Sequence, residues 1–158
     1  MNEQEAFDIA LEEARISYHE GGIPIGAALV SREGRLLGKG HNLRMQKGSP
    51  IHHGEISALQ DAKRLPAKAY KGSTMYTTTG ACILFGISRV VIGENNTFLG
   101  GERYLKERGI EVTVLGNKEC QELMERFIKE KPEAWYEDIG EEAMVRSKET
   151  NYECSLAL

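Results

Sequence analysis

The stretch STMYTTTGACILFGISRVVIG, residues 73–93, carries two strand patterns close together in the chain. Residues 73–79 are rich in β-branched and aromatic side chains, and residues 88–93 have an apolar centre, so each segment predicts a strand. The piece between them, residues 80–86, is short and apolar and fits either a helical turn or a continuation of the first strand. This stretch therefore predicts two strands of a sheet.

Outward from this stretch, helices and strands alternate after an N-terminal hairpin. Apolar residues at helical spacing, glycine and proline breaks, and alternating runs divide the chain into elements. The predicted strands are residues 25–30, 35–40, 73–79, 88–93 and 110–115, and the predicted helices are 3–20, 53–65, 101–108 and 118–129. This order predicts an α/β fold, a three-layer α/β/α sandwich whose central mixed sheet has about five strands with helices on both faces.

Length and composition limit the kinds of protein this chain can be. Its 158 residues, 41 % of them apolar, predict one domain over residues 1–140 and a polar C-terminal tail over 141–158. A formal net charge of −4 argues against a nucleic-acid partner, and no apolar run is long enough to span a membrane. Three scattered cysteines predict a cytoplasmic protein, with the nucleus as the open alternative.

The triplet His53-Gly54-Glu55 opens the second predicted helix. Two residues apart on a regular helix, side chains point to nearly opposite sides. In the first turn, however, both can lean over the helix end, where a metal ion and a substrate can sit. A histidine and a carboxylate so placed suit a metal-activated water and its proton shuttle. A lone His-x-Glu is common, so its meaning depends on the residues around it.

Those surroundings consist of short fragments in a fixed order and spacing. The fragments are GGIPIG (21–26), GHN (40–42), HGE (53–55), YTT (76–78), VIGEN (91–95) and WYEDIG (135–140). Together they resemble the fungal-type cytosine deaminases, within the cytidine-deaminase-like superfamily, and the resemblance runs from about residue 7 to 142. One fragment alone is weak, but the whole set is specific.

The resemblance implies a zinc-dependent hydrolase that converts cytosine to uracil and ammonia in pyrimidine salvage. It also implies a homodimer. Residues 135–138 resemble the segment that closes the family's pocket, and a closed pocket favours a free pyrimidine base over a nucleoside.

The resemblance also implies roles for individual residues. Glu55 would be the catalytic proton shuttle and His53 a ligand of Zn²⁺. The substrate-binding residues would be Asn42 at the edge of the pyrimidine, Gly54 at its carbonyl, Asp138 at an N–H of the base, Trp135 and Phe98 as an aromatic wall, and Ile25 against the ring. For Phe98, plain core packing is an equally good interpretation.

The chain departs from the family at one place. There the family continues Leu-Ser-Pro-Cys-x-x-Cys before Thr-Gly-Ala, whereas here Thr78 runs directly into Thr79. The two missing cysteines are zinc ligands in the family. None of Cys82, Cys120 and Cys154 has a C-x-x-C spacing. Cys82 is the thiol nearest in sequence to the missing segment. We interpret it as a small buried apolar residue in preference to a recruited zinc ligand.

Two other functions stay open on this sequence. The chain can be a metal-free, catalytically impaired deaminase-like protein that acts as a binding or dimerisation partner. It can also be a deaminase that edits nucleic acid, although the net charge and the pocket-closing segment argue against that.

Overall fold

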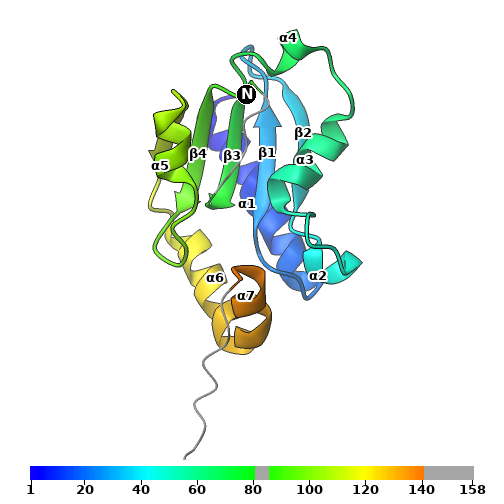
Figure 1. Cartoon of the computed structure of the whole chain (residues 1–158), viewed down its shortest axis with the longest axis vertical. Helices are drawn as coiled ribbons and strands as arrows, with labels where there is room; N and C mark the ends of the chain where they lie inside the picture. Colours follow the sequence, from blue (N-terminus) through cyan, green and yellow to red (C-terminus); the bar gives the residue numbers. More distant parts are fainter. Residues whose placement is uncertain (81–85, 141–158) are drawn as a thin grey trace, which may run out of the picture.

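A five-stranded mixed sheet forms the centre of the computed structural model, which describes residues 1–80 and 86–140 (Figure 1). The strands are β1 (Gly26–Val30), β2 (Leu36–His41), β3 (Thr74–Thr79), β4 (Arg89–Glu94) and β5 (Glu111–Val114), in the spatial order β2-β1-β3-β4-β5. β1 is antiparallel to β2 and β3, while β3, β4 and β5 are parallel. The predicted mixed sheet is confirmed.

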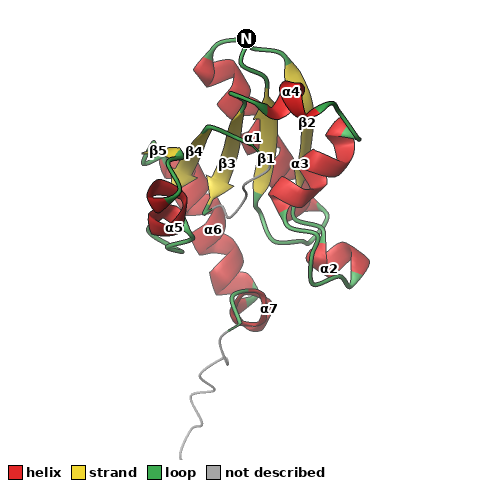
Figure 2. Ribbon diagram, turned by 45° about the horizontal axis from the view of Figure 1, so that its top comes forward, coloured by secondary structure: helices red, strands yellow, loops and turns green. Residues whose placement is uncertain are grey.

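Helices cover both faces of this sheet (Figure 2). α1 (Glu3–His19) and α6 (Lys118–Glu130) pack on one face, and α3 (Gly54–Ala62) and α5 (Glu102–Glu107) pack on the other. Side chains alternate along β1 because successive residues of a strand point to opposite faces. Ala27 and Leu29 accordingly join the α3 side, and Ala28 and Val30 join the α1 side. The predicted three-layer sandwich is confirmed.

α1 approaches the sheet closely because Gly26 has no side chain. A Cβ on Gly26 would lie only 2.0 Å from the carbonyl oxygen of Ala10 in α1. The helix itself begins in a capping box, in which Asn2 and Glu5 exchange side-chain and backbone hydrogen bonds of 2.9 Å. The start of β1, from which the site is built, is therefore tightly fixed against α1.

Four elements differ from the sequence prediction. α3 ends at Ala62 rather than at residue 65, because Lys63 leaves the helix with a φ of 60°. The segment 41–51, expected to be a loop, contains the short helix α2 (Arg44–Lys47). Pro132 does more than end α6, because it is the first residue of another helix, α7 (Pro132–Asp138). A further short helix, α4 (Ala67–Tyr70), precedes β3.

Some predictions lie outside the described residues. Residues 81–85, which include Cys82, and residues 141–158, which include Cys154, are not described, so the domain limit at residue 140 stays a prediction. Within residues 1–80 and 86–140, no helix has the length and apolar character needed to cross a bilayer.

Candidate active site

Asn42 follows the last residue of β2 and is fully buried. Its backbone N–H donates to the carbonyl oxygen of Ile25 at 2.8 Å, and its side-chain Oδ1 accepts the backbone N–H of Arg44 at 3.0 Å. Its Nδ2 atom is buried and has no hydrogen-bond partner in the structure as described. A buried donor without a partner costs about 1–3 kcal/mol, so this amide marks a place where a ligand atom can accept a hydrogen bond.

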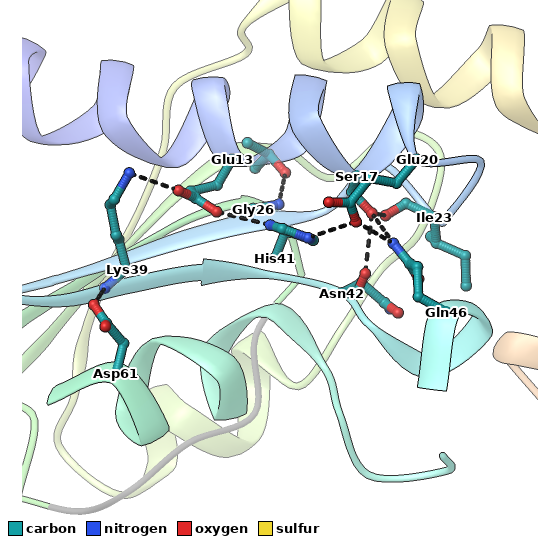
Figure 3. A network of polar contacts seen from close by, with 11 residues as sticks. Glu13, Ser17, Glu20, Ile23, Gly26, Lys39, His41, Asn42, Gln46 and Asp61 are labelled. Atoms are coloured by element: carbon teal, nitrogen blue, oxygen red, sulfur yellow. Dashed lines mark hydrogen bonds and ion pairs between the residues drawn. The ribbon is translucent and has the colours of Figure 1, made fainter. Parts of the chain in front are cut away.

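Side chains of α1 and α2 fix the backbone around Asn42 (Figure 3). The Ser17 hydroxyl lies 2.7 Å from the carbonyl oxygen of Ile23 and 3.0 Å from that of Asn42. Gln46 Nε2 lies 3.3 Å from Ser17 Oγ and 3.2 Å from Glu20 Oε2. These contacts tie the segment after β2 to the segment before β1, and the Asn42 amide is held in one orientation.

His41, the residue before Asn42, has a carboxylate on each ring nitrogen (Figure 3). Its Nδ1 lies 2.7 Å from Glu13 Oε2, and its Nε2 lies 3.1 Å from Glu20 Oε2. The second oxygen of Glu13 pairs with Lys39 at 2.8 Å. The hydrogen bond to Glu13 raises the pKa of His41 against the opposing effect of burial, and the same bond lowers the pKa of Glu13. When His41 is protonated, each of its ring nitrogens donates to one of these carboxylates.

This arrangement predicts a pH-dependent stability. The pKa of folded His41 lies above its unfolded value of about 6.5, so its stabilising effect is complete below that pH and is lost as the pH rises through the folded pKa. We expect the urea midpoint of the wild type to fall towards that of His41→Gln as the pH rises from about 6 to about 9. Unfolding curves at several pH values measure this, and a constant difference between the two proteins would contradict it.

His53, Gly54 and Glu55 form the beginning of α3. His53 is the half-buried residue before the helix, and Glu55 lies in the first turn with 6 % of its surface exposed. A Cβ on Gly54 would lie 3.1 Å from the carbonyl oxygen of Ile25 and 3.6 Å from the backbone nitrogen of Asn42. The start of α3 is thus in direct contact with the segments that carry Ile25 and Asn42, and the missing side chain of Gly54 eases this approach.

The aromatic residues of the predicted wall lie together. Trp135, in α7, is 3 % exposed, and its ring meets that of Phe98 edge to face with centroids 5.9 Å apart. Trp135 and Ile25 belong to one buried apolar cluster, and Phe98 packs against it. α7 therefore reaches from the C-terminal part of the chain to the start of β1.

Asp138, the last residue of α7, is paired with Arg44. The Arg44 Nη1 group contacts Asp138 Oδ1 and also donates to the Asp138 backbone carbonyl at 2.8 Å. Burial raises the pKa of the Asp138 carboxyl, and the charges of Arg44 and His53 act in the opposite direction. Asp138 is thus fixed at the end of α7 by its contacts with Arg44.

A hollow of about 400 Å³ adjoins this pair. Its walls come from α7 and from the segment 44–50, and Arg44 and Asp138 both line it. Asn42, Gly54, His53 and Glu55 are not among its lining residues. Of the predicted base-binding residues, Asp138 alone lines the hollow, which otherwise lies beside them.

The described residues do not supply a complete zinc site. Among them no three His, Cys, Asp or Glu side chains are grouped so that they could hold a metal ion. Cys120 cannot complete a set with His53, because it is buried in the cluster between α1 and the sheet, and burial raises its pKa to about 12. A catalytic zinc needs about three protein ligands. In the described part of the chain, His53 is the one predicted ligand.

The chain matches the cytidine and deoxycytidylate deaminase zinc-binding region over residues 1–94. It belongs to this deaminase family. It is 52 % identical over 147 residues to the cytosine deaminase of Candida albicans, which covers 89 % of this chain and 98 % of the relative. It is 32 % identical over 92 residues to the tRNA-specific adenosine deaminase of Aquifex aeolicus, covering 58 % of this chain and 60 % of that protein. The resemblance to cytosine deaminases is therefore confirmed.

Solved structures show the same fold. One, from a study of tRNA:A34 deaminases that edit the wobble position of transfer RNA, superposes with a TM-score of 0.62 at 24 % identity. The match covers 76 % of this chain and 99 % of that one. The α/β sandwich of this deaminase family is thus shown at the level of the fold, while the roles of individual site residues remain predictions.

Arg44 is the residue that the sequence interpretation missed. It contacts both Asn42 and Asp138, two predicted substrate-binding residues. A single arginine in a segment expected to be a loop gave no local signal. Only the proximity of α2 and α7 in the fold reveals it.

Proposed function

We propose that this chain is a cytosine deaminase that hydrolyses cytosine to uracil and ammonia. Its relative from Candida albicans carries that name, and its 52 % identity extends over almost the whole of both chains. The observation that carries the proposal is the unpartnered Nδ2 of Asn42, buried beside the start of α3. A hydrogen-bond donor in that position is incomplete without a ligand acceptor.

The residues around this amide suit the edge of a pyrimidine. In the proposed complex the carbonyl oxygen of the base accepts from Asn42 Nδ2 and from the backbone N–H of Gly54, which has no partner within the first turn of α3. Asp138 accepts from an N–H of the base through Oδ2, the oxygen that Arg44 does not engage. Trp135 and Phe98 provide flat apolar surface, on which bases stack.

Glu55 is the proposed proton carrier. Its carboxylate is buried at the start of α3, next to Gly54, and so stands beside a base bound there. Hydrolysis needs one proton of the attacking water moved to the ring nitrogen, where it stays in uracil. The other proton moves from the new C4 hydroxyl to the amine, which leaves as ammonia, and a positioned carboxylate can carry both in turn. In this family zinc, when bound, supplies hydroxide at neutral pH by lowering the pKa of bound water to about 7. His53 is the proposed zinc ligand in this chain.

The comparisons favour an enzyme over the alternative of a metal-free binding or dimerisation partner, because both curated relatives described above are deaminases. They also favour a free base over nucleic acid. Identity to the cytosine deaminase is 52 %, against 32 % to the tRNA-specific enzyme, and the net charge of −4 lacks the excess of positive charge that nucleic-acid binders carry.

The substitution Asn42→Asp tests the base-binding role. It keeps the Oδ1 acceptor for Arg44 and replaces the donor Nδ2 by an oxygen, which repels the carbonyl of the base. We expect cytosine to bind about ten-fold or more weakly, as measured by calorimetry on the wild type and the variant.

Asn117→Asp is the matched control. Asn117 caps the beginning of α6, where aspartate is an equally good cap. The Asn117→Asp variant should therefore bind cytosine with the affinity of the wild type. No detectable binding of cytosine to the wild type would overturn the proposed function. Unchanged binding by Asn42→Asp would refute the role of Asn42.

The assembly and cellular setting are further parts of this proposal. We propose a homodimer in the cytoplasm, working in pyrimidine salvage, because the resemblance to fungal-type cytosine deaminases implies that assembly and pathway. Sedimentation of the purified protein measures the dimer directly, and a monomer at micromolar concentration would refute it.

A further inference from the structure

Arg44 connects two predicted substrate-binding residues through two different groups. Its backbone N–H donates to Asn42 Oδ1 at 3.0 Å, so that oxygen is occupied and the unpartnered Nδ2 is the free end of the amide. Its guanidinium contacts the carboxylate of Asp138 and donates to the Asp138 carbonyl. One residue thus contacts two of the groups proposed to bind the base.

The contact of Arg44 with Asp138 restrains both the Asp138 side chain and the backbone at the end of α7. The last carbonyl groups of a helix have no partner within the helix and attract cations. Arg44 Nη1 satisfies such a carbonyl at 2.8 Å and binds the carboxylate of the same residue. A planar guanidinium with several fixed donors can hold both groups, whereas an ammonium is a single point of charge.

The pair is also more shielded than an ordinary surface ion pair. The Arg44 side chain is 20 % exposed and that of Asp138 is 7 % exposed, so solvent screens them little. By contrast, Arg103 and Glu107 form an exposed pair in α5, with side chains 93 % and 66 % exposed, of the kind that contributes little. The Arg44–Asp138 pair is thus a shielded polar contact between α2 and α7.

We infer that Arg44 is a positioning residue for base binding, which aligns Asn42 and Asp138 and holds α7, with Trp135, over the site. The inference rests on the proposed function for the identity of the ligand. The attachment of α7 is independent of the proposed function, because it exists in the free protein.

The first experiment measures that attachment without a ligand. Trp135 is the only tryptophan of the chain and is 3 % exposed, so its fluorescence reports whether α7 is seated. In Arg44→Met we expect the acrylamide quenching constant to rise about two-fold or more, because the apolar stem stays and the guanidinium is lost. Arg103→Met, in an exposed position, should leave quenching unchanged.

The second experiment measures cytosine affinity by calorimetry in the same proteins. We expect about ten-fold weaker binding by Arg44→Met, a partial recovery in Arg44→Lys, and wild-type affinity in Arg103→Met. Adding Asp138→Asn to Arg44→Met should weaken cytosine binding much less than Asp138→Asn weakens it in the wild type, because the two residues act together. A merely structural role would lower the urea midpoint while leaving the affinity of the folded protein unchanged.

The outcomes separate the two proposals. If the wild type does not bind cytosine, the proposed function fails, and the quenching result still decides whether Arg44 fastens α7. If the wild type binds and Arg44→Met binds equally well with Trp135 still shielded, the inference about Arg44 is overturned. Should Arg44→Met fail to fold, Arg44→Lys and Asp138→Asn give the same comparison in milder form.

Discussion

Inserting Leu-Ser-Pro-Cys-Ala-Ala-Cys between Thr78 and Thr79 is expected to raise the zinc content to about one ion per chain and to increase cytosine turnover on the order of 10³-fold or more. The insert supplies two thiolates, which with His53 make the three ligands that a catalytic zinc needs. The described residues lack such a set, and a single histidine does not hold zinc tightly. A complete site would generate hydroxide at neutral pH, which free water does not provide.

The insertion point is close to the start of α3. Thr78 Oγ1 accepts the backbone N–H of Gly26 at 3.1 Å, and the carbonyl carbon of Gly26 lies 3.6 Å from the position of a Cβ on Gly54. A segment that leaves the sheet at Thr78 therefore begins next to the helix that carries His53. The insertion separates only Thr79, the last residue of β3, from the rest of the strand, and we expect the two cysteines of the new segment to lie near that histidine.

An insert of the same length with serine at both cysteine positions is the matched control. It lengthens the chain equally but offers no thiolate, so zinc content and turnover should stay at the level of the original chain. Zinc is measured by elemental analysis of dialysed protein, and turnover by the change in absorbance from cytosine to uracil. Equal zinc and equal turnover in the cysteine and serine inserts would contradict the prediction.

Changing Glu55→Gln in the protein with the cysteine insert should lower turnover by about 10²–10⁴-fold while zinc content stays unchanged. Glutamine has nearly the same shape but cannot accept and return a proton. Glu55 is 6 % exposed in the first turn of α3, so the exchange alters the chemistry of the site with little change in packing. The measurements are kcat for cytosine and zinc per chain.

Glu102→Gln provides a matched control for removing a buried carboxylate. Glu102 is 8 % exposed and lies at the start of α5, with one oxygen unpartnered, and it belongs to none of the predicted site segments. Its substitution should leave kcat within about two-fold of the parent. Retention of full turnover by Glu55→Gln would show that another group moves the proton.

Periodicity was enough to predict the sheet and the longer helices, since a strand such as β1 alternates its side chains between two faces and α1 repeats its apolar residues at helical spacing. His53 and Glu55 were predictable because they are near neighbours in the sequence. α2 and α7 were not predicted as helices, because each is short and α7 begins at a proline. The link between Arg44 and Asp138 joins residues 94 positions apart, and no local pattern encodes such a contact.

This separation has a consequence for synthesis of the protein. A nascent chain that has emerged from the ribosome as far as β5 has every strand of the sheet, yet α7 and Asp138 are still missing. Closure of a loop this long comes late, after the local elements have formed. A small molecule that binds both Asn42 and Asp138 cannot guide early folding, because Asp138 is not yet in place. It can only stabilise the finished protein, by mass action.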